Sequence, residues 1–409
     1  MAPQAKKNKR IVLCLDGTWN NPTMTKERED GRKVFKPTNV LKMARAVRPL
    51  AKDGVHQVVY YDTGVGALGK YPGTSNKVIG YSDKLWGGAH GAGFEANVEQ
   101  AATFLTNNYL KGDKVFLFGF SRGAAQARAL AEFISWLGGL PIKSDAYYLP
   151  RFYRFYLEHR GERPPSAMTD DGERAAVTSL QDANIELLAV WDTVIALGSR
   201  VKAAFGWDSS KRDFYVAQSP TACVQHARQA IAIDERRFDF KMEVWQSKNE
   251  ALSMKQKWFA GVHSNVGGGY VNDGLANVTL DWFVDEASEL GLDFDNKFLR
   301  PYRKYPQDQA HDTRTAWMKI EDTVGIGFRR RVRNLTGHPA SAELEVDKSV
   351  FTRLFANPGS HNHLELYRPD NLLEFLESLG NQLPTYLDRV GYKVDPNKIP
   401  PDLAGIFNH

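Results

Sequence analysis

Cysteine is scarce in this sequence, which holds only Cys14 and Cys223 among its 409 residues. Two cysteines cannot build the disulfide framework of a small secreted domain, and they do not show the spacing of a zinc site. The glycine-rich stretch 87–93 lacks the Gly-Lys-Ser/Thr continuation of a phosphate-binding loop. We therefore expect a protein of a reducing compartment with no metal site and no bound cofactor.

Long apolar runs and a strong charge of one sign are absent as well. No segment approaches the roughly 20 apolar residues of a membrane-spanning helix, and the basic start MAPQAKKNKR is not followed by a signal-peptide core. The formal net charge of +5 is too small to indicate nucleic acid as the partner. We expect a disordered basic tail over residues 1–9 and a soluble, cytoplasmic chain, although export without a signal peptide is compatible with this sequence.

Short apolar runs, each ended by a polar residue or a glycine, predict six buried strands. Helical patterns lie on both sides of the third run, at 94–112 and 124–139. Alternating strands and helices predict an α/β fold with a mostly parallel central sheet flanked by helices. The runs begin at Arg10, His56, Asp113, Ala183, Arg228 and Gln256.

We expect residues 10–409 to form one domain with insertions near 158–182 and 295–345. The first stretch is rich in proline and charge, and the second is basic and irregular. Both are candidates for a lid or an accessory surface, and a solvated loop is the other interpretation of each.

The pentapeptide Gly119-Phe120-Ser121-Arg122-Gly123 matches G-x-S-x-G between an apolar run and an alanine-rich helical pattern. In α/β hydrolases this motif forms a tight strand-to-helix turn that exposes a nucleophilic serine. The helix dipole there favours developing negative charge, and the backbone N–H of Arg122 is placed to donate to an oxyanion. The sequence thus predicts a serine hydrolase of the α/β-hydrolase type with Ser121 as nucleophile.

A serine nucleophile needs a base, and α/β hydrolases carry serine, acid and histidine in that order. His263 ends an apolar run and enters the glycine-rich turn 267–269, whereas His226 lies at the wrong end of its strand. For the acid, Asp192 and Asp234 both end strands. Asp234 occupies the later strand, but the following Glu235-Arg236-Arg237 suggests an ion-paired strand end. Asp192 has no cation nearby in the sequence, which suggests the unpaired carboxylate that a triad needs beside its imidazole. The residue pattern alone does not decide whether Asp192 or Asp234 is the acid.

A second oxyanion donor is expected from a loop beside Ser121, and Gly17 after the first strand suits this role. The preceding Asp16 is interpreted as a residue that fixes the turn. The alternative that Asp16-Gly17-Thr18 belongs to a D-x-D-G-T phosphotransferase motif fails, because Cys14 stands where the nucleophilic aspartate would be.

The blocks LCLDGTWN, YYDTGVGA, FGFSRGAAQAR, VWDTV, AIDERR and FAGVHSNVGGGY, with SVFTR and YRPDNL near the C-terminus, resemble the Tle phospholipases, the lipase effectors of type VI secretion. The resemblance places the family's serine, aspartate and histidine on Ser121, Asp192 and His263, with Asp234 in reserve. It implies an α/β-hydrolase fold and a phospholipid or other ester substrate. Asn265 departs from the family pattern H-S-D-V-G-G-G-Y, and its loss of charge bears on the basicity or orientation of His263.

Two functions follow as expectations. The first is hydrolysis of carboxylic esters, most readily lipid-like acyl esters, by a phospholipase, lipase or esterase; the alternative is a non-catalytic binding or scaffold protein on a hydrolase fold. A basic stretch is either a surface for anionic lipid headgroups or a solvated loop whose arginines pair with Glu343 and Glu345. It contains Arg329, Arg330, Arg331 and Arg333.

Overall fold

A computed structural model of the chain describes residues 8–17, 25–27, 31–64, 89–195, 216–237, 240–248, 253–311, 332–356 and 366–407. Of the tail predicted at 1–9, residues 1–7 lie outside this part of the chain. Among the described residues, no helix combines the length and the apolar character needed to cross a bilayer.

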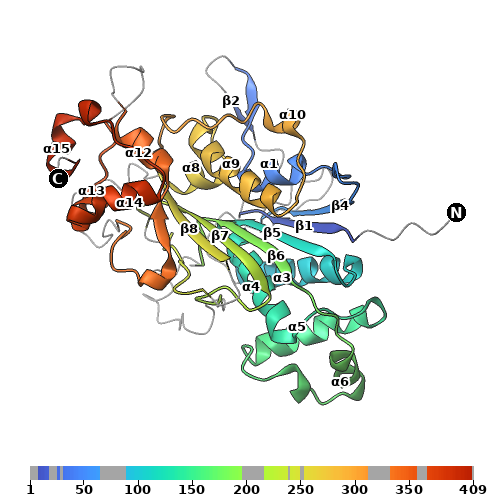
Figure 1. The fold of residues 1–409 in the computed structure, drawn as a ribbon. Coiled ribbons are helices and arrows are strands. Elements are labelled where there is room, and N and C mark those ends of the chain that lie inside the picture. The colour runs from blue at the N-terminus through green and yellow to red at the C-terminus, as the bar shows by residue number, and fades with distance from the viewer. Residues whose placement is uncertain are drawn as a thin grey trace.

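A seven-stranded sheet runs through the centre of the molecule in the order β4-β1-β5-β6-β7-β8-β9, and each neighbouring pair is parallel (Figure 1). The first six strands of the chain that enter it match the six predicted runs, which confirms the predicted α/β class; β9 was not predicted. The strands are β1 (Arg10–Leu15), β4 (Gln57–Asp62), β5 (Lys114–Phe120), β6 (Ile185–Trp191), β7 (Val224–Ala232), β8 (Ser253–Phe259) and β9 (Leu344–Val346), and β2 (Thr25–Glu27) with β3 (Lys33–Phe35) forms a separate antiparallel pair.

Helices cover both faces of the sheet. On one face lie α3 (Ala89–Asn108), α4 (Arg122–Leu137) and α5 (Leu149–Glu158), and on the other lie α1 (Asn39–Ala46) and α9 (Gly274–Glu289) (Figure 1). Because the strands are buried between these two layers, they read as nearly continuous apolar runs rather than as alternating ones. This is why the sequence predicted them.

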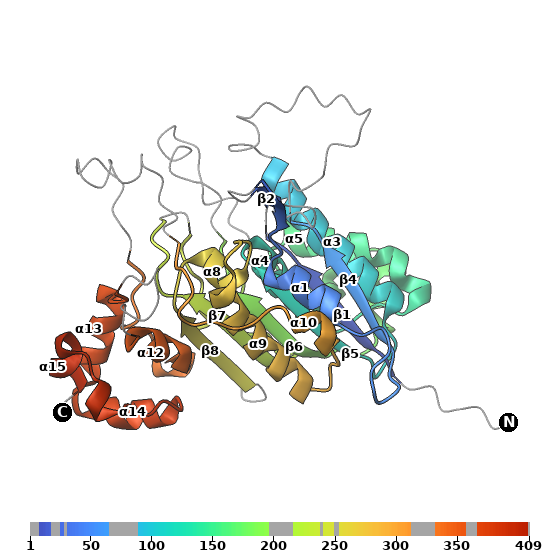
Figure 2. The same cartoon turned by 90° about the horizontal axis from the view of Figure 1, so that it is seen from above.

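Besides the apolar layers on the two faces of the sheet, a separate apolar cluster lies at the β8–β9 edge, where C-terminal helices pack against the sheet. Seen from above, these helices lie beyond β8, at the opposite end of the sheet from β4 (Figure 2). They are α12 (Lys348–Leu354), α13 (Asp370–Leu379), α14 (Leu383–Arg389) and α15 (Ala404–Phe407).

The two predicted insertions contain short helices. Residues 158–182 carry α6 (Asp171–Thr178), and residues 295–345 carry α10 (Asn296–Leu299), while 312–331 fall outside the described residues. Their role as lid or accessory surface stays a prediction. The other elements in the described part of the chain are α8 (His263–Gly267) and the 3-10 turns η1 (Lys143–Tyr148), η2 (Pro165–Ala167), η4 (Ala340–Ala342), η6 (Gly380–Gln382), η7 (Pro396–Lys398) and η8 (Pro401–Leu403).

The parallel register brings the strand ends to one edge of the sheet. Leu15 pairs with Gly119, Phe120 with Trp191, and Trp191 with Ala230. The polar residues that follow these strands therefore lie along the carboxyl edge, where ligands of open α/β sheets gather.

Candidate active site

Ser121 occupies a sharp turn between β5 and α4. Its φ of 58° and ψ of −120° lie in a region that favours glycine. The Ser121 N–H donates to the Trp191 carbonyl at 3.0 Å, and the Ser121 carbonyl accepts from the Val194 N–H at 3.3 Å, so the end of β6 holds the turn. A non-glycine residue held at positive φ costs about 1–3 kcal/mol, and such strain concentrates at functional sites.

The two glycines of the pentapeptide are required by close backbone packing. A Cβ on Gly119 would lie 2.4 Å from the Gly123 carbonyl oxygen, and a Cβ on Gly123 would lie 2.1 Å from the Leu15 carbonyl oxygen. The end of β1 therefore passes directly against the start of α4. Only glycine at both positions allows Ser121 this turn.

His263 is the first residue of α8, and its side chain is buried. Its ring lies 4.6 Å from the Phe120 ring and 4.8 Å from the Phe240 ring, measured between centroids. A Cβ on Gly267 would lie 2.0 Å from the Phe120 ring, so α8 also packs tightly against Phe120. Since Phe120 directly precedes Ser121, these contacts bring His263 to the part of the edge that carries Ser121.

Asp192 follows β6 and faces the His263 ring, with 2.5 Å between Asp192 Oδ2 and His263 Nδ1. The Ala232 N–H donates to the other oxygen, Oδ1, at 3.0 Å. Asp192 is 1% exposed, and like Ser121 it has a positive φ, here 42°. The structure thus joins Asp192 to His263 through a buried hydrogen bond.

Arg333 contacts the same carboxylate. Its Nη1 lies 2.5 Å from Asp192 Oδ1 and its Nη2 lies 3.1 Å from Asp192 Oδ2; both nitrogens also donate to carbonyls, those of Ala232 and Phe240 at 2.9 Å. Two interpretations from the sequence are wrong here. Asp192 does have a cation beside it, and Arg333 is buried, whereas both alternatives for the basic stretch, a lipid-facing surface and a solvated loop, leave it exposed. Because 141 positions separate the two residues, no local pattern could reveal the pair.

The charges around the pair set its protonation. Burial alone would raise the pKa of Asp192, but the guanidinium of Arg333 and the hydrogen bond from His263 bring it well below its ordinary value. Burial lowers the pKa of His263, and the nearby Asp192 carboxylate only partly offsets this. The pair is thus an ionised aspartate and a neutral imidazole at neutral pH.

Asp234 takes a different place. Its carboxylate accepts from the Gly261 N–H at 2.6 Å and from the Tyr367 hydroxyl at 3.1 Å, and burial raises its pKa. The ion pair expected after this strand exists, but it joins Arg237 to Glu235. Asp234 therefore joins the end of β7 to the turn after β8 rather than facing the imidazole.

Glu235 was missed by the sequence reasoning, which saw it only as part of a charged strand end. It is 1% exposed, and its carboxylate accepts the backbone N–H of His263 at 3.2 Å and two bonds from the Arg237 guanidinium, both at 2.9 Å. The Arg237 guanidinium also stacks on Phe240. His263 is thus held by its backbone through Glu235 and by its ring through Asp192.

The two candidate oxyanion donors differ in their surroundings. The Arg122 N–H lies in the first turn of α4, where backbone N–H groups have no partner within the helix. The Gly17 N–H donates to Asp16 Oδ1 at 2.7 Å. Asp16 also accepts from Thr38 at 2.5 Å and from the Tyr61 hydroxyl at 2.8 Å, contacts that fix the turn after β1.

Asn265 lies in α8 two residues after His263. Its side-chain oxygen accepts the N–H of Val262 at 3.3 Å and the N–H of His311 at 3.1 Å. Its amide nitrogen lies 3.3 Å from His311 Nδ1. Asn265 therefore ties α8, which carries His263, to the chain near residue 311.

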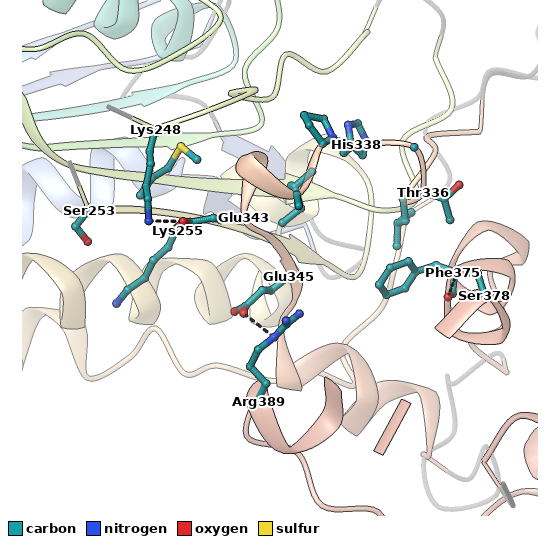
Figure 3. Close-up of a pocket in the computed structure, with 16 residues that line it drawn as sticks. Lys248, Ser253, Lys255, Thr336, His338, Glu343, Glu345, Phe375, Ser378 and Arg389 are labelled. Atoms are coloured by element: carbon teal, nitrogen blue, oxygen red, sulfur yellow. Dashed lines mark hydrogen bonds and ion pairs between the residues drawn. The ribbon is translucent and has the colours of Figure 1, made fainter. Parts of the chain in front are cut away.

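A pocket of about 930 Å³ lies elsewhere in the molecule, at the beginning of β8 and beside α13 and α14 (Figure 3). Ion pairs cross it from Lys248 to Glu343 and from Arg389 to Glu345. None of the residues around Ser121 lines it. Within the described ranges, no group of three or more histidine, cysteine, aspartate or glutamate side chains is arranged to hold a metal ion.

Comparison with known proteins shows the family to which this chain belongs. Residues 9–286 match the sequence profile of the T6SS phospholipase effector Tle1-like catalytic domain. An uncharacterized Saccharomyces cerevisiae protein, YEL023C, is 25% identical over 246 residues, which cover 58% of this chain and 33% of that protein. The chain thus matches about a third of the length of this curated relative.

Two solved structures align with this chain at low sequence identity and low TM-score. An uncharacterized Pseudomonas aeruginosa protein aligns with a TM-score of 0.42 and 16% identity, covering 96% of this chain and 61% of that one. The Tle1 effector bound to the VgrG spike of the type 6 secretion system aligns with a TM-score of 0.39 and 16% identity, covering 66% of this chain and 52% of that one.

Proposed function

Because the chain belongs to the family of T6SS phospholipase effector Tle1-like catalytic domains, we propose that it hydrolyses carboxylic esters of lipids through an acyl-enzyme formed on Ser121. One observation carries this proposal: a buried hydrogen bond of 2.5 Å joins Asp192 to His263 at the edge where Ser121 sits in a strained turn. Serine, aspartate and histidine in this chain order are the elements of an α/β-hydrolase triad.

In the first half of the reaction, His263 Nε2 accepts the proton of the Ser121 hydroxyl while Oγ attacks the ester carbonyl carbon. The resulting tetrahedral oxyanion collapses, the alcohol leaves with the proton from His263, and the acyl group stays on Ser121. In the second half, His263 deprotonates water, which attacks the carbonyl carbon of the acyl-enzyme. The second tetrahedral oxyanion collapses, Ser121 Oγ leaves with the proton from His263, and the acid is released. Asp192 keeps the proton on Nδ1, so that Nε2 is the basic nitrogen.

The oxyanion is assigned to the backbone N–H of Arg122, with Gly17 as the second donor. Arg122 needs no rearrangement, because its N–H is at a helix start where negative charge is favoured. The Gly17 N–H has to turn from Asp16 toward the substrate first. Losing one such donor costs roughly 100- to 1,000-fold in kcat at other acyl-transfer sites.

The test is labelling with a fluorophosphonate, which reacts with an activated serine and requires no known substrate. The wild-type chain is expected to take up one label and Ser121→Ala none. Ser378→Ala, which removes an exposed serine of α13, is the matched control and should label like the wild type. Labelling that persists in Ser121→Ala, or its absence from the wild type, would favour the alternative of a non-catalytic binding protein.

Contact with a membrane surface is the second part of the proposal, since a lipase has to reach packed lipid. Of the arginines considered for this surface, Arg333 is excluded by its burial, and 329–331 lie outside the described residues. Each exposed basic residue near an anionic bilayer contributes about 1 kcal/mol. Co-sedimentation with anionic vesicles at low salt, lost at high salt or with neutral vesicles, is the expected result; equal, negligible sedimentation with rapid turnover of a soluble ester would indicate a soluble esterase.

A further inference from the structure

We propose that Arg333 is a positioning residue of this active site, which holds the Asp192 carboxylate that orients His263. The inference rests on the proposed function and deepens it. It also assigns a role to the C-terminal part of the chain, since Arg333 lies beyond residues 9–286 that match the family.

Arg333 and Asp192 form a bidentate ion pair. Two guanidinium nitrogens face two carboxylate oxygens, at 2.5 and 3.1 Å, which is the fork geometry that fixes a carboxylate in both position and plane. The same nitrogens donate to the carbonyls of Ala232 and Phe240, so the guanidinium itself cannot rotate freely. Asp192 Oδ2 is shared between Arg333 and His263, and its direction toward the ring is set by this fork.

The position of Arg333 is in turn fixed from α13. The side-chain amide of Asn371 donates to the Arg333 carbonyl at 2.9 Å and to the Ile233 carbonyl at 3.2 Å. Asn371 and Arg333 are both less than a tenth exposed. A chain of buried polar contacts therefore runs from the C-terminal helices through Arg333 and Asp192 to the imidazole.

Arg333 also changes the charge that His263 experiences. Asp192 and Glu235 favour the imidazolium, whereas Arg237 opposes it. Arg333 opposes it too, since a cation on the Asp192 carboxylate cancels part of that negative charge. Removing the guanidinium is therefore expected to make His263 more basic, as well as to loosen the carboxylate.

The experiment compares Arg333→Met, Arg333→Lys and the control Arg389→Met, which removes an arginine from a solvent-exposed pair in the same C-terminal region. We measure kcat and KM for a soluble short-chain ester from pH 5 to 9, per active site titrated with a fluorophosphonate. Arg333→Met should lower kcat at least about tenfold with little change in KM. A loss of this size is seen in metalloenzymes when a residue that orients a metal ligand is removed. The acid limb of kcat/KM should move up by about one pH unit.

Arg333→Lys keeps the charge but loses the fork, so kcat should fall several-fold while the acid limb stays near that of the wild type. Arg389→Met should match the wild type. Should Arg333→Met not fold, the lysine variant decides: wild-type kcat in Arg333→Lys overturns the inference. Reduced kcat in Arg333→Met without movement of the acid limb also overturns it, because a structural role alone predicts that result.

The Ser121→Ala variant separates failure of this inference from failure of the proposed function. If Ser121→Ala still turns over ester, the proposed function itself fails. An inactive Ser121→Ala beside a fully active Arg333→Met refutes the role of Arg333 only.

Discussion

Replacing Asp192 by asparagine tests the centre of the proposed site with almost no change in shape. In the structure the carboxylate accepts from His263, from the Ala232 N–H and from two nitrogens of Arg333. An amide offers one acceptor oxygen and an NH₂ donor, so it either turns its NH₂ toward Arg333 or favours the wrong imidazole tautomer. The corresponding change in a serine protease lowers kcat about 10⁴-fold, equivalent to about 5.4 kcal/mol, and we expect a similar loss here.

The same substitution leaves the Arg333 guanidinium buried without its counter-charge. Losing one partner of a buried ion pair costs about 3–5 kcal/mol of folding stability, a large part of the 5–15 kcal/mol typical of a domain. Turnover of a soluble ester must therefore be measured on folded protein, with thermal unfolding recorded beside it. Asp192→Asn should show both the loss of ester turnover and a lower thermal unfolding temperature.

Asp234→Asn is the matched control for the choice of acid. Asp234 is also a carboxylate that follows a strand, here partly buried, but it binds Gly261 and Tyr367 rather than the imidazole. Its asparagine variant should keep turnover within about tenfold of the wild type, as expected for a residue that makes no contact restricted to the transition state. A loss of several thousandfold in Asp234→Asn together with a nearly active Asp192→Asn would refute our assignment.

Three further outcomes follow from the same geometry. Ser121→Gly should abolish ester turnover yet raise the free energy of unfolding by about 1 kcal/mol, since glycine relieves the strain at φ 58°; a less stable variant in chemical denaturation would contradict this. Gly267→Ala places a Cβ 2.0 Å from the Phe120 ring, so it should cost about 1–3 kcal/mol and lower kcat by displacing α8; wild-type stability and kcat would argue against that packing. His263 has a lowered pKa, so its stabilising effect is complete above the unfolded-state pKa of about 6.5 and is lost as the pH falls toward the folded pKa. Thermal unfolding from pH 5 to 8 should therefore show a steeper acid loss for the wild type than for His263→Gln, and equal slopes would exclude this contribution.

The parts of the fold that were predictable are those whose signal is local. Burial on both sides makes the strands apolar throughout, so β1 and β5 stand out as runs that stop at a polar residue. The turn at Ser121 is equally local, because the glycines that its packing requires lie within the same pentapeptide. By contrast, β9 has three residues and pairs only with β8, too short a run for apolar periodicity to reveal.

The choice of acid shows where residue patterns stop being informative. Asp192 and Asp234 both end buried strands, and the argument that Asp192 lacked a cation was wrong, although the resemblance pointed to the residue that contacts His263. An arginine 141 positions away supplies that cation, and its backbone is held by Asn371 of α13, one of the C-terminal helices that pack at the β8–β9 edge.

That arrangement explains why both interpretations of the basic stretch, a lipid-facing surface and a solvated loop, left Arg333 exposed. Arg333 follows a run of arginines, and on composition alone such a run favours solvent or an anionic partner. A buried guanidinium is tolerated when its donors are satisfied, and Arg333 donates to the Asp192 carboxylate and to the carbonyls of Ala232 and Phe240. The energetic cost of burying this charge is offset by the charge of the Asp192 carboxylate, so the two residues depend on each other. A shortened chain ending near residue 286 should for this reason lose turnover even where its sheet forms, because Asp192 would keep its charge without the cation that holds it.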